Sequence, residues 1–159
     1  MSTPPYQVLK ANHTGLTVSS LSQSLKFWHD LLGFPILYQH TASGPLTSAV
    51  VGVPNAVINV AMLEVPGGHH RIELEEYTSP SAEARKTFRS ESCDVGNVHV
   101  ALEVKGLNEM LDRMKDLKWV SLSEPQLVTK GRYDGWRLVF VRGPDGETVE
   151  LMEVPASAT

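Results

Sequence analysis

The chain has 159 residues and a mass of 17.5 kDa, which is enough for one ordinary domain whose core needs no disulfide. Apolar residues make up 42% and charged residues 20% of the chain, values that are typical of a folded globular protein and exclude disorder or a coiled coil. The 14 basic and 18 acidic side chains leave a net charge of −4 without a long run of either sign, so we expect neither a nucleic-acid nor a membrane partner.

Cysteine usage and the hydropathy pattern both favour a cytoplasmic protein. Cys93 is the only cysteine, so an intrachain disulfide or a cysteine-based zinc cluster is excluded. The chain has no apolar run of 18 residues, and its start lacks the basic and apolar regions of a signal peptide. Any acid–base or metal chemistry must therefore come from histidines and carboxylates.

The first half of the chain is predicted to contain one helix and four strands. Leu21, Leu25, Trp28 and Leu32 recur every three or four residues, and Gly33 then gives a stop signal. Alternation of apolar and polar residues predicts the strands around this helix. In chain order the prediction is a strand over 11–18, a helix over 21–32, and strands over 34–40, 57–65 and 71–77.

The same order returns after a polar stretch, 78–94, that includes a predicted short helix at 81–90. A strand over 97–104 and a helix over 107–117 are followed by strands over 120–128, 136–141 and 148–154. The sequence therefore predicts an α+β fold, in which two βαβββ modules form an open, cleft-shaped mixed sheet. We expect a single domain over residues 1–159, with module one at about 9–78, a linker at about 79–94 and module two at about 95–155.

Strand alternation places one histidine and one glutamate of each module on the face that points away from the apolar set. In module one these residues are His13 and Glu73, and in module two they are His99 and Glu150. A divalent metal with open positions for water or substrate suits two imidazoles and two carboxylates on facing sheets. The alternative is four isolated polar residues, but the repetition of the pair favours a site.

Five segments together resemble the vicinal oxygen chelate superfamily, which includes glyoxalase I, methylmalonyl-CoA epimerase, extradiol dioxygenases, and fosfomycin- and bleomycin-resistance proteins. The similarity covers about residues 9 to 155. The segments are His-Thr-Gly-Leu-Thr-Val at 13–18, Lys-Phe-Trp-His-Asp-Leu-Leu-Gly-Phe at 26–34, Arg-Ile-Glu-Leu at 71–74, Asn-Val-His-Val-Ala-Leu-Glu-Val at 97–104, and Arg-Gly-Pro-Asp-Gly-Glu-Thr-Val-Glu-Leu at 142–151.

The resemblance implies metal ligands at His13, Glu73, His99 and Glu150. A carboxylate at position 73 fits glyoxalase I and the epimerase better than the extradiol dioxygenases. We therefore expect a metal-dependent isomerase, epimerase or lyase that stabilises an enediolate or enolate of a small carbonyl substrate. Glu150 is the first choice for the general base, with Glu73 as ligand or second proton carrier, and these roles could be reversed.

Two other functions stay open on the sequence alone. One is an Fe(II)-dependent, extradiol-type dioxygenase that uses His13, His99 and Glu150 as a facial triad. The other is a metal-free protein that binds and sequesters a small molecule. The identity of the metal, whether Zn, Ni, Co, Mn or Fe, is also open.

A few residues outside the four candidate ligands have weaker claims. Arg132, Tyr133 and Trp136 lie on a loop that could meet an anionic or aromatic substrate. Glu75 shares the face of Glu73 and is the nearest rival ligand. The adjacent histidines His69 and His70 are expected at the surface. We expect a homodimer, and whether the two modules complete a cleft within one chain or across two stays open.

Overall fold

The structure is a computed structural model that describes residues 6–86 and 91–155. It divides into two compact units, one made of Met1–Leu21 with Gly33–Ala82 and the other of Ser22–Leu32 with Glu83–Thr159. Each unit is built on one mixed β-sheet. The predicted α+β class is confirmed, while the assignment of all residues to a single domain stays a prediction.

Sheet A, in the first unit, has the strand order β1-β4-β3-β2. Strand β1 runs parallel to β4, and the other neighbours are antiparallel. Buried Ile72 and Leu74 lie on one face of β4, so Glu73 and Glu75 lie on the other. The strands are β1 (Thr14–Val18), β2 (Ile36–Ser43), β3 (Val57–Glu64) and β4 (Arg71–Ser79).

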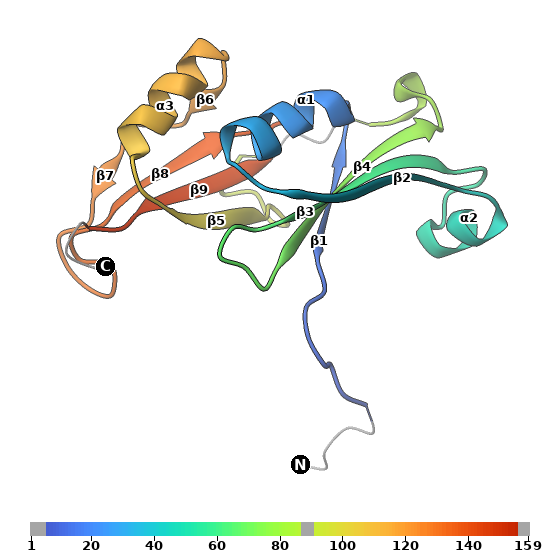
Figure 1. Cartoon of the computed structure of the whole chain (residues 1–159), viewed down its shortest axis with the longest axis horizontal. Coiled ribbons are helices and arrows are strands. Elements are labelled where there is room, and N and C mark those ends of the chain that lie inside the picture. The colour runs from blue at the N-terminus through green and yellow to red at the C-terminus, as the bar shows by residue number, and fades with distance from the viewer. Residues whose placement is uncertain (1–5, 87–90, 156–159) are drawn as a thin grey trace. The chain divides into compact units, whose positions relative to one another are not determined.

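A helix that the sequence analysis did not predict, α2 (Pro45–Val51), connects β2 to β3 (Figure 1). Pro45 stands in its first turn, and Gly52 ends it in the left-handed conformation with φ of 69°. Val51 packs against Ala56 and Ile58. The segment between β2 and β3 therefore forms a short helix, with proline near its start and glycine at its end.

Sheet B, in the second unit, repeats the topology of sheet A, with the order β5-β9-β8-β6 and with β7 also paired to β8. Its parallel pair is β5 with β9. The predicted strand over 120–128 is interrupted, because Pro125 cannot donate a ladder hydrogen bond. The strands are β5 (His99–Val104), β6 (Val120–Ser121), β7 (Gln126–Leu127), β8 (Arg137–Arg142) and β9 (Thr148–Glu153).

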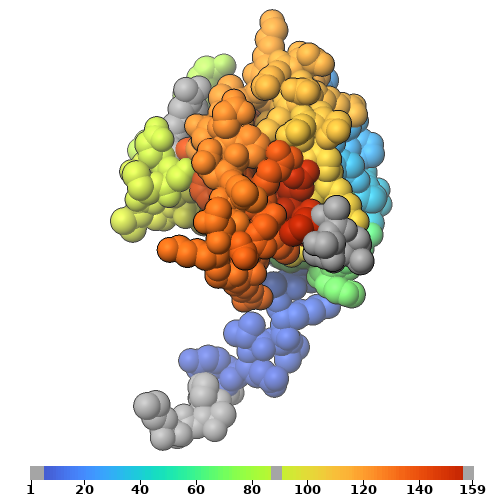
Figure 2. All heavy atoms as spheres, turned by 90° about the vertical axis from the view of Figure 1, so that its left-hand side faces the viewer, coloured from blue at the N-terminus to red at the C-terminus, as the bar shows by residue number. Residues whose placement is uncertain are grey.

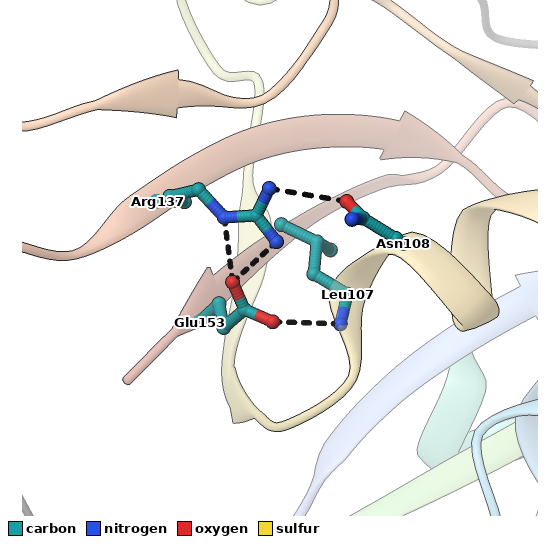
Figure 3. Close-up of polar contacts among 4 residues, drawn as sticks. All are labelled: Leu107, Asn108, Arg137 and Glu153. Atoms are coloured by element: carbon teal, nitrogen blue, oxygen red, sulfur yellow. Dashed lines mark hydrogen bonds and ion pairs between the residues drawn. The ribbon is translucent and has the colours of Figure 1, made fainter. Parts of the chain in front are cut away.

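Helix α3 (Leu107–Asp116) lies over one face of sheet B (Figure 1). Its N-cap residue, Gly106, has no side chain to cap the helix, and Glu153 of β9 supplies the acceptor instead. The N–H of Leu107 donates to Glu153 Oε1 over 2.9 Å, while Arg137 donates to Glu153 Oε2 over 2.6 Å and to Asn108 Oδ1 over 3.1 Å (Figure 3). A carboxylate that is distant in the sequence thus fixes the start of α3.

The helix that follows β1 groups with the unit of sheet B rather than with the sheet of its own repeat. It starts as α1 (Leu21–Leu25) and widens into the π-helical turn η1 (Lys26–Leu31). Phe27 contacts the Trp119 ring edge-on at a centroid distance of 5.1 Å, and Trp28 Nε1 donates to Glu147 Oε1 over 3.3 Å. Both contacts join this helix to residues of its own unit, on the chain beyond α3.

The predicted helix over 81–90 is present only as the short 3₁₀ turn η2 (Ala82–Ala84), and residues 87–90 lie outside the described part of the chain. Most other boundaries agree with the sequence within a few residues. In residues 6–86 and 91–155, no helix is long and apolar enough to cross a membrane.

Candidate functional site

The first candidate pair is His13 with Glu73, where Nε2 of the ring lies 3.0 Å from Oε2 of the carboxylate. His13 immediately precedes β1, and Glu73 lies on β4, the neighbour of β1. The other ring nitrogen, Nδ1, lies 2.9 Å from Asn12 Oδ1, which orients the imidazole. The Glu73 side chain is 18% exposed and that of His13 is 37% exposed, so a ligand can reach both.

Glu75, the rival ligand, follows Glu73 on the same face of β4. Burial raises the pKa of Glu75, the negative charge of Glu73 raises it further, and His13 opposes both effects. A Cβ at Gly15 would lie 3.7 Å from Glu75 Oε2, so Glu75 extends beside the glycine that follows His13 by two residues. The face around the first pair is therefore acidic.

The second candidate pair is His99 with Glu150, where Nε2 lies 3.4 Å from Oε2. His99 begins β5 and Glu150 lies on the adjacent β9. The Phe140 ring, directly opposite Glu150 on β8, has its centroid 5.2 Å from that of His99. The sequence analysis did not name Phe140. Alternation along β8 could have indicated it, because Val139 and Val141 on either side of it are buried, which leaves Phe140 on the opposite face.

The two pairs occupy equivalent positions of the two sheets. Gly15 is the register partner of Glu73, and Ala101 is the register partner of Glu150. Each histidine stands two residues before that small residue. The face alternation predicted for both pairs is thus present in the structure, and each pair is brought together within its own unit.

The donor chemistry and spacing of each pair fit a transition metal. Two ligands bound at about 2.1 Å and separated by about 90° to 110° lie roughly 3.0–3.4 Å apart, which is the range of the two observed nitrogen–oxygen distances. Within the described ranges, no three His, Cys, Asp or Glu side chains form a group that could hold a metal ion. Each pair by itself therefore supplies two ligands.

The three candidate substrate residues, Arg132, Tyr133 and Trp136, form a cluster on the hairpin between β7 and β8. The rings of Tyr133 and Trp136 lie 5.2 Å apart, and the guanidinium of Arg132 lies 5.7 Å from the Tyr133 ring. This hairpin, coloured orange, lies at the surface in Figure 2. Strand β8 starts at Arg137, directly after the hairpin. Its residue Phe140, which pairs with Glu150, follows three residues later, so the end of the hairpin lies roughly 10 Å along the strand from that position.

His70 has a structural contact that the sequence analysis missed. Its Nε2 lies 2.8 Å from Thr14 Oγ1, at hydrogen-bond distance. The contact joins the start of β4 to the strand that follows His13. No local pattern could have revealed it, because the partners are 56 residues apart.

The sequence model of the Glyoxalase/Bleomycin resistance protein/Dioxygenase superfamily matches residues 10–151. The chain belongs to this superfamily. The predicted resemblance is therefore confirmed.

Two curated superfamily relatives are similar over most of the chain. A 2-epi-5-epi-valiolone epimerase of Actinomyces sp. is 28% identical over 151 residues, which cover 92% of this chain and 80% of the relative. A probable lactoylglutathione lyase of Synechocystis sp. is 28% identical over 144 residues, which cover 89% of this chain and 92% of the relative.

Solved structures share the fold at lower sequence identity. A glyoxalase family protein from Bacillus cereus has a TM-score of 0.81 and 22% identity, with 96% of this chain and 98% of that chain covered. The fosfomycin resistance protein FosX from Listeria monocytogenes has a TM-score of 0.62 and 14% identity, with 95% and 98% covered. A FosX structure containing Mn(II) has a TM-score of 0.61 and 13% identity, with 95% and 94% covered.

Proposed function

We propose that the chain is a metal-dependent isomerase, epimerase or lyase that moves a proton next to the carbonyl group of a small substrate. The observation that carries the proposal is the recurrence of one His–Glu pair at the same register position of both sheets. The names of the two curated relatives, an epimerase and a probable lyase, support this class over an oxygenase.

In this proposal the residues that would hold the divalent ion are His13 with Glu73 in the first unit and His99 with Glu150 in the second. Imidazole nitrogen and carboxylate oxygen suit Zn, Ni, Co, Mn and Fe alike, and FosX, which shares the fold, has been solved with Mn(II). When bound, such an ion supplies positive charge that stabilises a developing substrate oxyanion.

The chain's own groups then carry the proton. Glu150 accepts it at a carboxylate oxygen, with the Phe140 ring beside it on β8 as an apolar wall. Glu73 serves as ligand or returns the proton on the opposite face of the substrate. Proton removal and return without any other step gives epimerisation or isomerisation.

The variant Glu150→Gln tests the role of the base. Deuterium uptake from D₂O next to the carbonyl of 2-epi-5-epi-valiolone or lactoylglutathione is followed by NMR with metal-loaded protein. Because the amide cannot accept the proton, we expect exchange to fall by roughly 100- to 10,000-fold while most metal binding remains.

The control is Glu103→Gln, which makes the same change at an exposed position of β5. It should leave the exchange rate unchanged. Exchange close to wild type in Glu150→Gln would remove that residue from the chemistry. Oxygen consumption by Fe(II)-loaded protein would identify a dioxygenase instead.

Calorimetric titration with Zn²⁺ tests the ligand set independently of activity. His13→Ala and His99→Ala should each weaken binding by at least about tenfold, because each removes one nitrogen ligand. The exposed His69 provides the control variant His69→Ala, which should bind Zn²⁺ like the wild type.

Two results would contradict this ligand set. An effect confined to one histidine would remove the other pair from the ligand set. No binding by the wild type would favour a metal-free sequestering protein.

A further inference from the structure

Strand β2 (Ile36–Ser43) is an edge of sheet A that lacks the usual protection of edge strands. Edge strands expose unpaired N–H and C=O groups, and charge, proline, a bulge or a covering element normally prevents their pairing with another chain. No Lys, Arg, Asp, Glu or Pro lies within β2. Its one register irregularity lies at the start, between Ile36 and Tyr38, so the rest of the strand is a regular edge.

The absence of charge extends well beyond this strand. Residues 31–63 contain no Asp, Glu, Lys or Arg, although 20% of the whole chain is charged, which would place about seven charges in a stretch of that length. Six of the eight residues of β2 are nevertheless exposed. An exposed surface without charge is unusual for a soluble protein face.

The second repeat provides an internal comparison. Residues 117–142, which cover the same part of the topology, contain seven charged side chains. The strand there is broken into β6 and β7, of two residues each. The edge of sheet B therefore has the protection that β2 lacks.

Helix α2 follows this edge strand along the chain (Figure 1), and it carries exposed apolar side chains. Leu46 and Val50 lie one helical turn apart on the same face and are 78% and 76% exposed. The inner side of α2 is already held, because the N–H of Ala56 donates to Ser48 Oγ over 3.2 Å. The two outward side chains are thus not needed for packing within the unit.

We propose that a second copy of this chain docks on the β2 surface, which we define as Ile36–Ser43 together with Leu46 and Val50. Strand β2 pairs antiparallel with β2 of the second copy about a two-fold axis, and α2 flanks the pair. In a two-fold contact a surface packs against the same surface of the second copy. A charged surface would therefore face like charges, whereas the β2 surface, which has no Lys, Arg, Asp or Glu, faces no such repulsion. Antiparallel pairing also satisfies the exposed backbone groups of both edges.

The test measures the dimer dissociation constant of the full chain by analytical ultracentrifugation over a concentration series. Gln39→Lys brings two like charges together near the middle of the paired strands, whereas Val50→Lys puts a charge into the apolar α2 flank at each end of the contact, and we expect each to weaken dimerisation by at least about tenfold. Leu127→Lys is the matched control, because Leu127 is 61% exposed on β7, which pairs with β8 as β2 pairs with β3. This control should dimerise like the wild type.

A charge-reversal experiment identifies the partner strand. Mixing Gln39→Lys with Gln39→Glu should restore dimers, because opposite charges then face each other across the axis. Circular dichroism confirms that each variant is folded, and Val50→Lys decides if Gln39→Lys does not fold. A monomeric wild type, or a dimer that resists both lysine substitutions, would overturn the proposal.

Discussion

At the scale of single residues, Glu153 holds the start of α3 to sheet B. Burial raises the pKa of Glu153, but the hydrogen bond from the Leu107 N–H and the hydrogen bond and charge of Arg137 outweigh burial, so the pKa lies below its usual value. The folded state therefore favours the ionised carboxylate. Its contribution to stability is present above the unfolded pKa and is lost as pH falls through the folded pKa.

We predict that Glu153→Gln lowers the free energy of unfolding by about 1.5–3 kcal/mol at neutral pH, because charge-assisted hydrogen bonds to Leu107 and Arg137 are weakened. Urea unfolding measures this difference. The gap between wild type and variant should shrink as pH falls below about 4.5, the usual value for glutamate.

Two comparisons make the pH dependence specific. Glu103→Gln, at an exposed position of β5, should change the free energy of unfolding by less than about 0.5 kcal/mol. Glu147→Gln should show the opposite dependence of stability on pH. Burial raises the pKa of Glu147, although the backbone N–H groups of Glu147 and Asp145 and the Trp28 side chain donate hydrogen bonds to its carboxylate. Stability of the wild type relative to that variant should fall as pH rises from about 4.5 through the raised folded pKa. Equal slopes for Glu147 and Glu153 would contradict this account.

At the scale of secondary structure, the π-turn η1 determines which side chains of the first helix are buried. A regular helix would bury Leu25 and Leu32 with Trp28, as the sequence periodicity predicted. The wider turn shifts this pattern, so that Phe27 and Leu31 are buried and Leu32 is only half-buried. Phe27 makes two edge-to-face contacts, with Trp28 at 5.5 Å and with Trp119 at 5.1 Å.

We predict that Phe27→Leu destabilises the protein by about 1–3 kcal/mol, because two aromatic contacts worth about 0.5–1.5 kcal/mol each are lost. Thermal and urea unfolding measure the change. Tyr133→Leu is the control, since it removes a ring that pairs with Trp136 on an exposed hairpin, and it should cost less than about 0.5 kcal/mol. A similar loss in both variants would show that burial of Phe27 is not the cause.

At the scale of the whole molecule, the duplication and both His–Glu pairs could be predicted because they depend on local periodicity. Alternation in a strand is independent of distant contacts, so it placed Glu73 away from Ile72 and Glu150 away from Leu151. The joint role of the two pairs in binding one metal stays a prediction.

The features that the sequence did not reveal depend on distant partners. The grouping of 22–32 with sheet B rests on Trp119 and Glu147, far along the chain. Helix α2 was missed because its apolar residues form no single buried stripe, and none of the residues of α2 is buried. The cap of α3 by Glu153 joins residues 46 positions apart.

The placement of residues 22–32 has a consequence for how the chain can be divided. Since this segment belongs to one unit and the residues on both sides belong to the other, the backbone passes between the units after residues 21, 32 and 82. A single proteolytic cut after residue 82 would therefore leave the amino-terminal fragment carrying a helix of the carboxy-terminal unit. No continuous segment of the chain therefore contains one complete unit and nothing of the other.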